Sequence, residues 1–184
     1  MDKEFVIGVT GASGICYARR LLDVLCTDAT VHVIISGVAK KIALHERVDL
    51  TGFPAEYHEN DKMFAKIASG SYRYDGMVVV PCSQKTLAAI AHGYADNLIT
   101  RTADVCLKER RTLILVPREM PLSEIHLQNM LAAHRAGATI MPASPPFYNN
   151  PERIDDLVDM VVARILDHLG VQHSLAERWG GADA

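Results

Sequence analysis

Short apolar runs alternate with longer amphipathic stretches along most of this chain. The runs are rich in valine, isoleucine and leucine and predict five strands, at residues 4–10, 30–36, 77–81, 112–116 and 138–141. The stretches between and after them have apolar residues at helical spacing and predict helices at residues 14–26, 38–48, 83–92, 96–110, 123–136 and 154–169. Strand and helix therefore follow one another through most of the sequence.

The last helix is the best defined of these elements. Ile154, Leu157 and Val161 begin an apolar stripe that continues to Leu169, with charged residues at many of the other positions. The alternation predicts an α/β fold of three layers, Rossmann- or flavodoxin-like, with a doubly wound parallel sheet. Residues 49–74 are polar and weakly periodic, and we expect a long excursion with one short helix or strand there. Because repeats, low-complexity tracts and linkers are lacking, we expect a single domain over residues 1–184.

A glycine-containing corner, Val9-Thr10-Gly11-Ala12-Ser13-Gly14, joins the first strand to the first helix. Glycines allow a tight turn and a close approach to a ligand, and the free N–H groups at a helix start attract an anion. The spacing differs from the dinucleotide motif G-x-G-x-x-G, and no Lys-Ser/Thr pair follows as in a P-loop. The corner therefore indicates a phosphate-binding turn, with a plain tight turn as the open alternative.

Residues suited to binding an anionic ligand follow the first four predicted strands directly, and the fifth strand leads to one more through a proline-containing loop. In an open parallel sheet these carboxyl ends share one edge, where ligands bind. The residues in question are Gly11, Ala12 and Ser13, then Ser36, then Ser83, Gln84, Lys85 and Thr86, then Arg118 and Glu119, and finally Tyr148. Hydroxyls, amides and cations on one rim favour a phosphorylated cofactor. In the alternative interpretation, Ser83 is only a helix cap, and Arg118 and Glu119 form a surface ion pair.

Charge and hydropathy exclude two broad classes of function, general nucleic-acid binding and membrane-spanning proteins. A formal net charge of −3 argues against a general nucleic-acid binder, and no apolar run approaches the ~20 residues that span a bilayer. The sequence passes from Met1 almost directly into the first strand, so we expect no signal peptide. The four cysteines form no C-x-x-C pair, which is typical of reduced thiols in a cytoplasmic protein.

The histidines give no metal-binding pattern. Eight of them are scattered without the H-x-H or H-E-x-x-H spacing of known sites, and His126 and His134 suit the surface of one helix. We therefore expect no metal site.

At the level of motifs, the chain resembles the UbiX-like flavin prenyltransferases, a family long described as aromatic-acid (3-polyprenyl-4-hydroxybenzoate) decarboxylases or their subunits. The resemblance covers nearly the whole chain and is weakest in residues 49–74. It rests on Thr10-Gly11-Ala12-Ser13-Gly14, Pro81-Cys82-Ser83-x-Lys85-Thr86-Leu87, Ala103-Asp104-Val105-Cys106-Leu107-Lys108-Glu109-Arg110-Arg111, Leu115-Val116-Pro117-Arg118-Glu119-x-Pro121-Leu122-Ser123-x-Ile125-His126-Leu127 and Pro146-Phe147-Tyr148.

The resemblance implies a flavoprotein that transfers a dimethylallyl group from dimethylallyl phosphate to N5 and C6 of reduced FMN. The product, prenylated FMN, would serve a separate UbiD-type decarboxylase of aromatic acids. It also implies a cytoplasmic homododecamer whose sites are shared between neighbouring subunits, with no metal required. Shared sites would explain why Arg101, Lys108 and Arg164 need not lie at strand ends of their own chain.

The resemblance also implies roles for individual residues. The FMN contacts would be Gly11, Ala12, Ser13, Ser36, Ser83, Gln84, Lys85, Thr86 and Arg118. Contacts to the prenyl phosphate would come from Tyr148 and Arg164, with Arg101 and Lys108 in the same pocket. Ser13 and Glu119 would relay protons, and Glu46 and Trp179 would lie near the reacting atoms. Positioned cations such as Lys108 can stabilise the departing phosphate, and an aromatic face such as that of Trp179 can stabilise a cation.

Two other functions remain open. An FMN-dependent decarboxylase of a cysteine-derived acid depends on a histidine base and a Pro-x-Met-Asn segment, which the stretch 141–145 lacks. A flavodoxin-like electron carrier would not need the cations Arg101, Lys108, Arg118 and Arg164 about its flavin. The older description as a decarboxylase subunit is compatible with prenyl transfer, because the protein would then supply the cofactor that its partner consumes.

Overall fold

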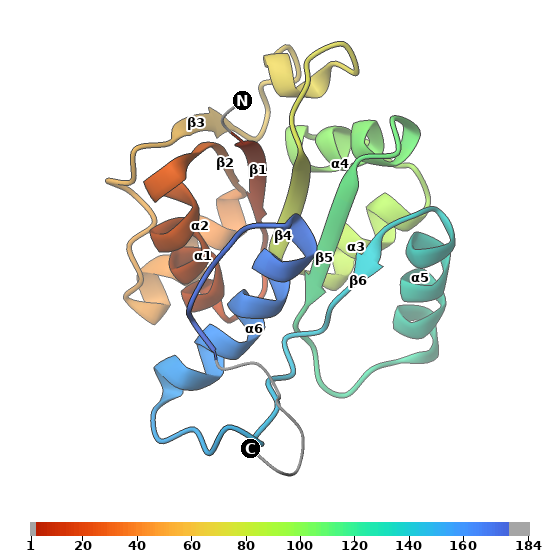
Figure 1. Cartoon of the computed structure of the whole chain (residues 1–184). Coiled ribbons are helices and arrows are strands. Elements are labelled where there is room, and N and C mark those ends of the chain that lie inside the picture. Colours follow the sequence, from red (N-terminus) through yellow and green to blue (C-terminus); the bar gives the residue numbers. More distant parts are fainter. Residues whose placement is uncertain (1–2, 177–184) are drawn as a thin grey trace.

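The computed structural model describes residues 3–176, which form one parallel sheet with helices on both faces (Figure 1). The sheet has six strands in the order β3-β2-β1-β4-β5-β6. Their bounds are β1 Lys3–Val9, β2 Ala29–Ile35, β3 Glu56–Glu59, β4 Gly76–Cys82, β5 Thr112–Pro117 and β6 Thr139–Ile140. This is the doubly wound arrangement that the alternation of strands and helices predicts.

The helices divide between two apolar clusters, one on each face of the sheet. On one face, β1 residues Phe5, Ile7 and Val9 pack with α1 (Ile15–Asp28) and α6 (Ile154–Leu169), beside α2 (Gly37–Glu46). On the other face, Val6 packs with α3 (Gln84–Ala91), α4 (Leu98–Lys108) and the 3₁₀ turn η1 (Lys66–Ala68). Helix α5 (Glu124–Arg135) lies against α3. Alternate residues of each central strand thus serve opposite faces, so these strands are apolar throughout.

The prediction of five strands was one short. Strand β3 has the sequence Glu-Tyr-His-Glu and lies at the edge of the sheet, paired only with β2. An edge strand with an exposed, polar sequence carries no apolar alternation, so the pattern does not reveal it. The stretch 49–74 therefore contains both a short strand and a short 3₁₀ turn.

The strand order reverses between β1 and β4, whose following helices pack on opposite faces. At this point the ends of the two strands are tied together by Thr10, whose side chain is buried. Its hydroxyl donates to the Pro81 carbonyl at 2.8 Å and accepts from the Ser83 N–H at 2.7 Å. Such a reversal opens a crevice at the carboxyl edge of the sheet, the usual ligand site of doubly wound folds. Across residues 3–176 no helix combines the length and apolarity needed to cross a membrane.

Candidate functional site

A cavity of about 520 Å³ opens at the carboxyl edge, above the reversal between β1 and β4. Its size falls within the range of small-molecule sites, roughly 300–1,000 Å³. Every residue predicted to contact FMN, except Ser13, lines this cavity, and so does Glu119. The full lining is Thr10, Gly11, Ala12, Ser36, Val38, Asn60, Ser83, Gln84, Lys85, Thr86, Asn97, Ile99, Arg118 and Glu119.

The start of α3 supplies the polar wall of the cavity. Ser83 is the helix cap, and its hydroxyl accepts from the Thr86 N–H at 3.4 Å and bonds to the Thr86 hydroxyl at 3.1 Å. Both polar atoms of the Gln84 amide are buried without a hydrogen-bond partner in residues 3–176. A buried, unpaired amide that lines a cavity is costly unless a ligand completes its bonding. Ser83 is therefore a cap, as the alternative interpretation held, and also part of the cavity wall.

Two glycines, Gly11 and Gly14, shape the corner after β1. A Cβ on Gly11 would come within 2.7 Å of the Val38 side chain, which also lines the cavity. Gly14 has φ +102, a left-handed conformation that other residues rarely adopt. The corner is thus shaped by glycine, as its sequence predicts.

The first turn of α1 is occupied by a carboxylate of the protein itself. Glu46, at the end of α2, accepts from the Gly14 N–H at 3.0 Å and from the Ile15 N–H at 2.9 Å. Burial alone would raise the pKa of Glu46, but hydrogen bonds from the Ser13 hydroxyl and these two N–H groups outweigh it and lower the pKa. The prediction that the first helix offers free N–H groups to a ligand was therefore wrong, because Glu46 uses them.

Arg118 and Glu119 follow β5 directly and line the cavity from the end of that strand. Arg118 donates from Nε to the Ser13 carbonyl oxygen at 3.2 Å, which joins this rim to the glycine corner. Glu119 is exposed, and its Oε1 accepts from the Met120 N–H at 3.1 Å. The Ser13 hydroxyl bonds to Glu46, so the relay between Ser13 and Glu119 stays a prediction.

Comparison with known proteins identifies the family. The model of the flavoprotein family matches residues 1–166. The flavin prenyltransferase UbiX of Methanocaldococcus jannaschii is 50% identical over 182 residues, which is 96% of this chain and 98% of that protein. The chain belongs to the UbiX-like flavin prenyltransferase family.

Solved structures of UbiX-like proteins match the whole fold. The crystal structure of AnUbiX (PadA1) with FMN and dimethylallyl pyrophosphate superposes with a TM-score of 0.92 at 44% identity, over 98% of this chain and 99% of that one. A dodecameric FMN-dependent UbiX-like decarboxylase from Escherichia coli O157:H7 gives 0.92 at 46% identity, over 97% and 100% of the two chains. The three-layer α/β architecture of the UbiX-like family is therefore shared throughout.

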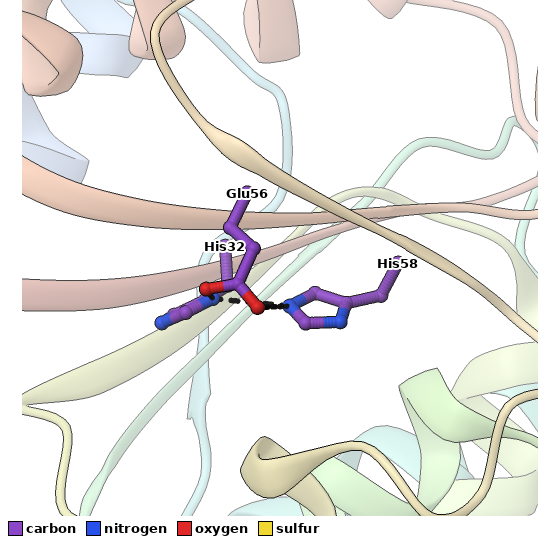
Figure 2. A group of neighbouring side chains, drawn as sticks. All are labelled: His32, Glu56 and His58. Carbon is purple, nitrogen blue, oxygen red and sulfur yellow. Dashed lines mark hydrogen bonds and ion pairs between the residues drawn. The ribbon is translucent and has the colours of Figure 1, made fainter.

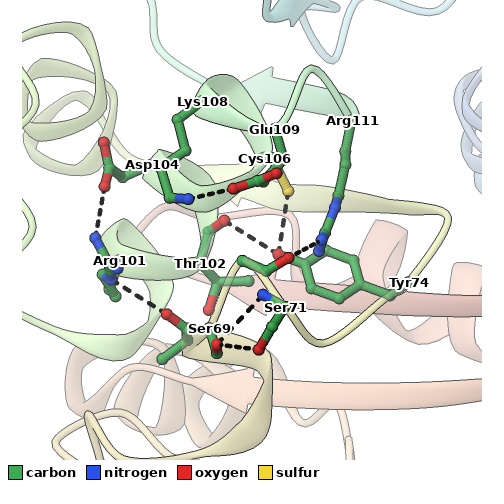
Figure 3. Close-up of polar contacts among 12 residues, drawn as sticks. Ser69, Ser71, Tyr74, Arg101, Thr102, Asp104, Cys106, Lys108, Glu109 and Arg111 are labelled. Atoms are coloured by element: carbon green, nitrogen blue, oxygen red, sulfur yellow. Dashed lines mark hydrogen bonds and ion pairs between the residues drawn. The ribbon is translucent and has the colours of Figure 1, made fainter.

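Two cations assigned by the UbiX-like resemblance lie along α4, outside the cavity lining (Figure 3). Arg101 donates to the Ala68 carbonyl at 3.2 Å and pairs with Asp104 at 2.8 Å. Lys108 is in the last turn of the helix and pairs with Glu109. Helix α4 begins at the cavity, so its rise of about 1.5 Å per residue takes Lys108 roughly 15 Å from that end. Lys108 therefore lies beyond reach of its own cavity.

The remaining substrate residues of the UbiX-like pattern also lie outside the cavity lining. Arg164 is exposed on α6, where it pairs with Asp167 at 2.7 Å, and Tyr148 is exposed on the loop after β6. Trp179 lies outside the described residues. Their predicted contacts with the prenyl phosphate stay predictions.

Sequence reasoning gave no binding role to five residues of the cavity lining, which are Thr10, Val38, Asn60, Asn97 and Ile99. Asn60 follows β3; its carbonyl accepts from the Leu98 N–H at 2.8 Å, and its side chain accepts from the Ile99 N–H at 3.1 Å. Asn97 caps α4, and Ile99 lies in its first turn. The signal for Asn97 was its capping position, whereas Asn60 could be found only by recognising β3.

Proposed function

We propose that this protein is a flavin prenyltransferase, which joins the dimethylallyl group of dimethylallyl phosphate to N5 and C6 of reduced FMN. The observation that carries the proposal is the cavity lined by Gly11, Ser36, Gln84 and Arg118, in a chain that belongs to the UbiX-like family. Support also comes from the crystallised relative with bound FMN and dimethylallyl pyrophosphate, which shares the fold over nearly its whole length.

The residues of the cavity fit a flavin nucleotide. The unpaired Gln84 amide can bond both a donor and an acceptor, as the edge of a flavin ring offers. Because Glu46 takes the first turn of α1, the start of α3 is the better anion site. There Lys85 adds a flexible cation, and Ser36, which lines the same cavity, is a further donor. We assign the phosphate of FMN to this group.

The positive side chains would promote the departure of phosphate from the dimethylallyl group. Breaking the carbon–oxygen bond of an allylic phosphate leaves an allylic cation and a phosphate anion, and fixed positive charges stabilise the anion. Arg118 lines the cavity itself, while Arg101, Lys108 and Arg164, with Tyr148, would reach it from neighbouring subunits. Reduced FMN supplies an electron-rich ring that takes up the five-carbon group. Trp179 would stabilise the allylic charge through its ring face.

Three residues on the rim would handle the proton that leaves on ring closure. The lowered pKa keeps Glu46 ionised near neutral pH, so it fixes the Ser13 hydroxyl as a donor toward itself. Glu119 lines the cavity and is exposed, so its carboxylate is free to accept a proton and to pass it to water. We assign Glu119 as the proton acceptor and Ser13 with Glu46 as its positioned neighbours.

We infer that the working form is a homo-oligomer, and specifically a dodecamer. The Escherichia coli relative is dodecameric. Large apolar side chains are also exposed before, along and after α5, which in a soluble protein commonly marks an interface. They are Met120, Leu122, Ile125, Leu127, Leu131 and Phe147. The product would pass, in the cytoplasm, to a prenylated-FMN-dependent decarboxylase of aromatic acids.

The mass of the flavin tests this function. Purified protein is mixed anaerobically with reduced FMN and dimethylallyl phosphate, and the flavin is extracted for mass spectrometry. A gain of one five-carbon unit supports prenyl transfer. An unchanged flavin, together with CO₂ released from an aromatic or cysteinyl acid by this protein alone, would identify a direct decarboxylase. An unchanged flavin without CO₂ would leave an electron carrier as the better interpretation.

A further inference from the structure

We propose that His32, Glu56 and His58 form a binding site for a divalent cation of the zinc class, between β2 and the edge strand β3. In the sheet register His32 lies opposite Glu56, and His58 lies opposite Ile34, so all three side chains share one face. Figure 2 shows the three side chains converging on one point. The sequence predicts no metal site, since the two histidines are 26 positions apart and only the strand pairing brings them together.

The distances between the three side chains suit a metal ion. Nδ1 of His32 is 3.0 Å from Nε2 of His58 and 3.4 Å from Oε2 of Glu56, and Nε2 of His58 is 3.6 Å from Oε1 of Glu56. Ligands at about 2.0–2.1 Å from a tetrahedral zinc ion lie roughly 3.3 Å from one another. One ligand atom from each side chain lies within 4.8 Å of the other two, so a small rotation of the Glu56 carboxylate would place all three on one face of a zinc tetrahedron, with water in the fourth position.

A second group of residues orients His32 for this role. His32 is fully buried, and its Nε2 lies 2.6 Å from Oε1 of Glu4, which also accepts from the Tyr72 hydroxyl at 2.5 Å. A carboxylate there accepts the Nε2 proton, so the lone pair of Nδ1 points toward His58 and Glu56. A carboxylate behind a histidine is the common way to fix a metal ligand. On binding, the proton of His58 that now lies between the two rings moves to its Nδ1.

The ammonium group of Lys66 now binds the Glu56 carboxylate that would ligate the ion. Its ammonium lies 2.7 Å from Oε2 of Glu56 and 5.1 Å from the centre of the Tyr72 ring. The carboxylate is thus neutralised by a cation in the present structure. The lysine side chain is 43% exposed and flexible, so a divalent ion can displace it into solvent. Lys66 is therefore a competitor for Glu56, and its removal should strengthen metal binding.

An ion here would fasten the edge of the sheet. Strand β3 pairs with β2 over only four residues, and Asn60 directly after it bonds to the start of α4 and borders the cavity. Two ligands from β3 and one from β2 would hold this segment in place. None of the three ligands lines the cavity, so the site is separate from prenyl transfer.

Zinc titration of the flavin-free, full-length protein tests the proposal by calorimetry. We expect one Zn²⁺ per chain, and Co²⁺ in its place should give the visible absorption of a four-coordinate ion. His58→Gln and Glu56→Gln should each weaken binding at least tenfold, and Glu4→Gln should weaken it about 10- to 100-fold. Lys66→Met should tighten it several-fold. His173→Gln is the matched control, because His173 pairs with the single carboxylate of Asp167 at 3.3 Å and should leave the affinity unchanged.

Amide hydrogen exchange provides a second measurement, because an ion bound loosely elsewhere on the surface would not slow exchange in β3. Zinc should slow amide exchange in residues 56–60 of the wild type and leave it unchanged in His58→Gln, whose fold is checked by its circular dichroism. The proposal is overturned if the wild type binds no zinc saturably, or if His58→Gln and Glu56→Gln keep wild-type affinity. Both outcomes are independent of any transferase activity, since no prenyl substrate or flavin is present.

Discussion

The Glu46 carboxylate spans from the end of α2 to the first turn of α1. It meets two backbone N–H groups and the Ser13 hydroxyl, an arrangement that satisfies donors which a helix start otherwise leaves to a ligand or water. The same carboxylate thus stabilises the fold and orients a predicted catalytic hydroxyl. Its charge also counters the partial positive charge at the start of α1, so the phosphate of a cofactor is better held elsewhere.

The lowered pKa of Glu46 gives a prediction for stability. Glu46→Gln should reduce the free energy of unfolding by about 1 kcal/mol at pH 7, since a charged acceptor at a helix start is lost. A carboxyl whose pKa is lowered by folding stabilises above its unfolded-state pKa, about 4.3. That advantage disappears as the pH falls through the lower, folded-state value. The difference between wild type and variant should therefore shrink as the pH falls below about 4.

Urea unfolding of the flavin-free proteins from pH 7 to pH 3 measures this difference. Glu152→Gln is the matched control, because Glu152 is exposed and should show no difference from the wild type at any pH. An effect of Glu46→Gln that stays constant over the whole range would contradict the role of its charge.

At the scale of elements, the site depends on how the ends of β1 and β4 are joined. Thr10 links them through a hydroxyl that both donates and accepts, so the glycine corner and the start of α3 are held at a fixed separation. These two segments supply most of the residues predicted to bind FMN. The geometry of the cavity therefore depends on one buried hydroxyl.

The substitution Thr10→Val tests whether this hydroxyl fixes the geometry of the cavity. It keeps the shape of the side chain but leaves the Ser83 N–H without its acceptor, which should cost about 1–3 kcal/mol of stability. FMN binding should weaken as well, since α3 is no longer fixed. Thermal unfolding and flavin fluorescence titration measure the two effects. Thr112→Val, at an exposed position at the start of β5, should change neither, and equal behaviour of the two variants would remove Thr10 from this role.

The sequence predicts the elements best where burial imposes a pattern. The central strands and α6 are apolar on the faces that they bury, so their existence and their succession along the chain could be inferred directly. Once the sheet is parallel, the residues after each strand must meet at one edge. For that reason Ser36, Gln84 and Arg118, far apart along the chain, could be assigned to a single cavity from the sequence alone.

Other features arise only from contacts between distant segments. Strand β3 is polar because it lies at an exposed edge, and Asn60 is found only through it. The use of the α1 start by Glu46 depends on where α2 ends, 32 residues further along the chain. The pairing of His32 with His58 likewise follows from strand register. No local pattern of residues contains this information.

At the scale of the whole molecule, the cations predicted to act on the prenyl phosphate are divided. Arg118 lines the cavity, whereas Lys108 is at the far end of α4 and Arg164 is exposed on the opposite face of the sheet. A single chain does not bring these charges together. If they act on one phosphate, they must come from different subunits, and the assembly is then part of the catalyst.

Mixed oligomers of two inactive variants test this division of the site. Chains with Lys108→Ala and chains with Arg118→Ala are co-expressed with different tags, and assemblies carrying both tags are isolated. A site built from Arg118 of one chain and Lys108 of its neighbour is intact in about a quarter of random arrangements, so roughly a quarter of wild-type prenyl transfer should return. Assemblies of either variant alone are the controls. If both residues acted within one chain, every site would remain defective, and no activity would be recovered.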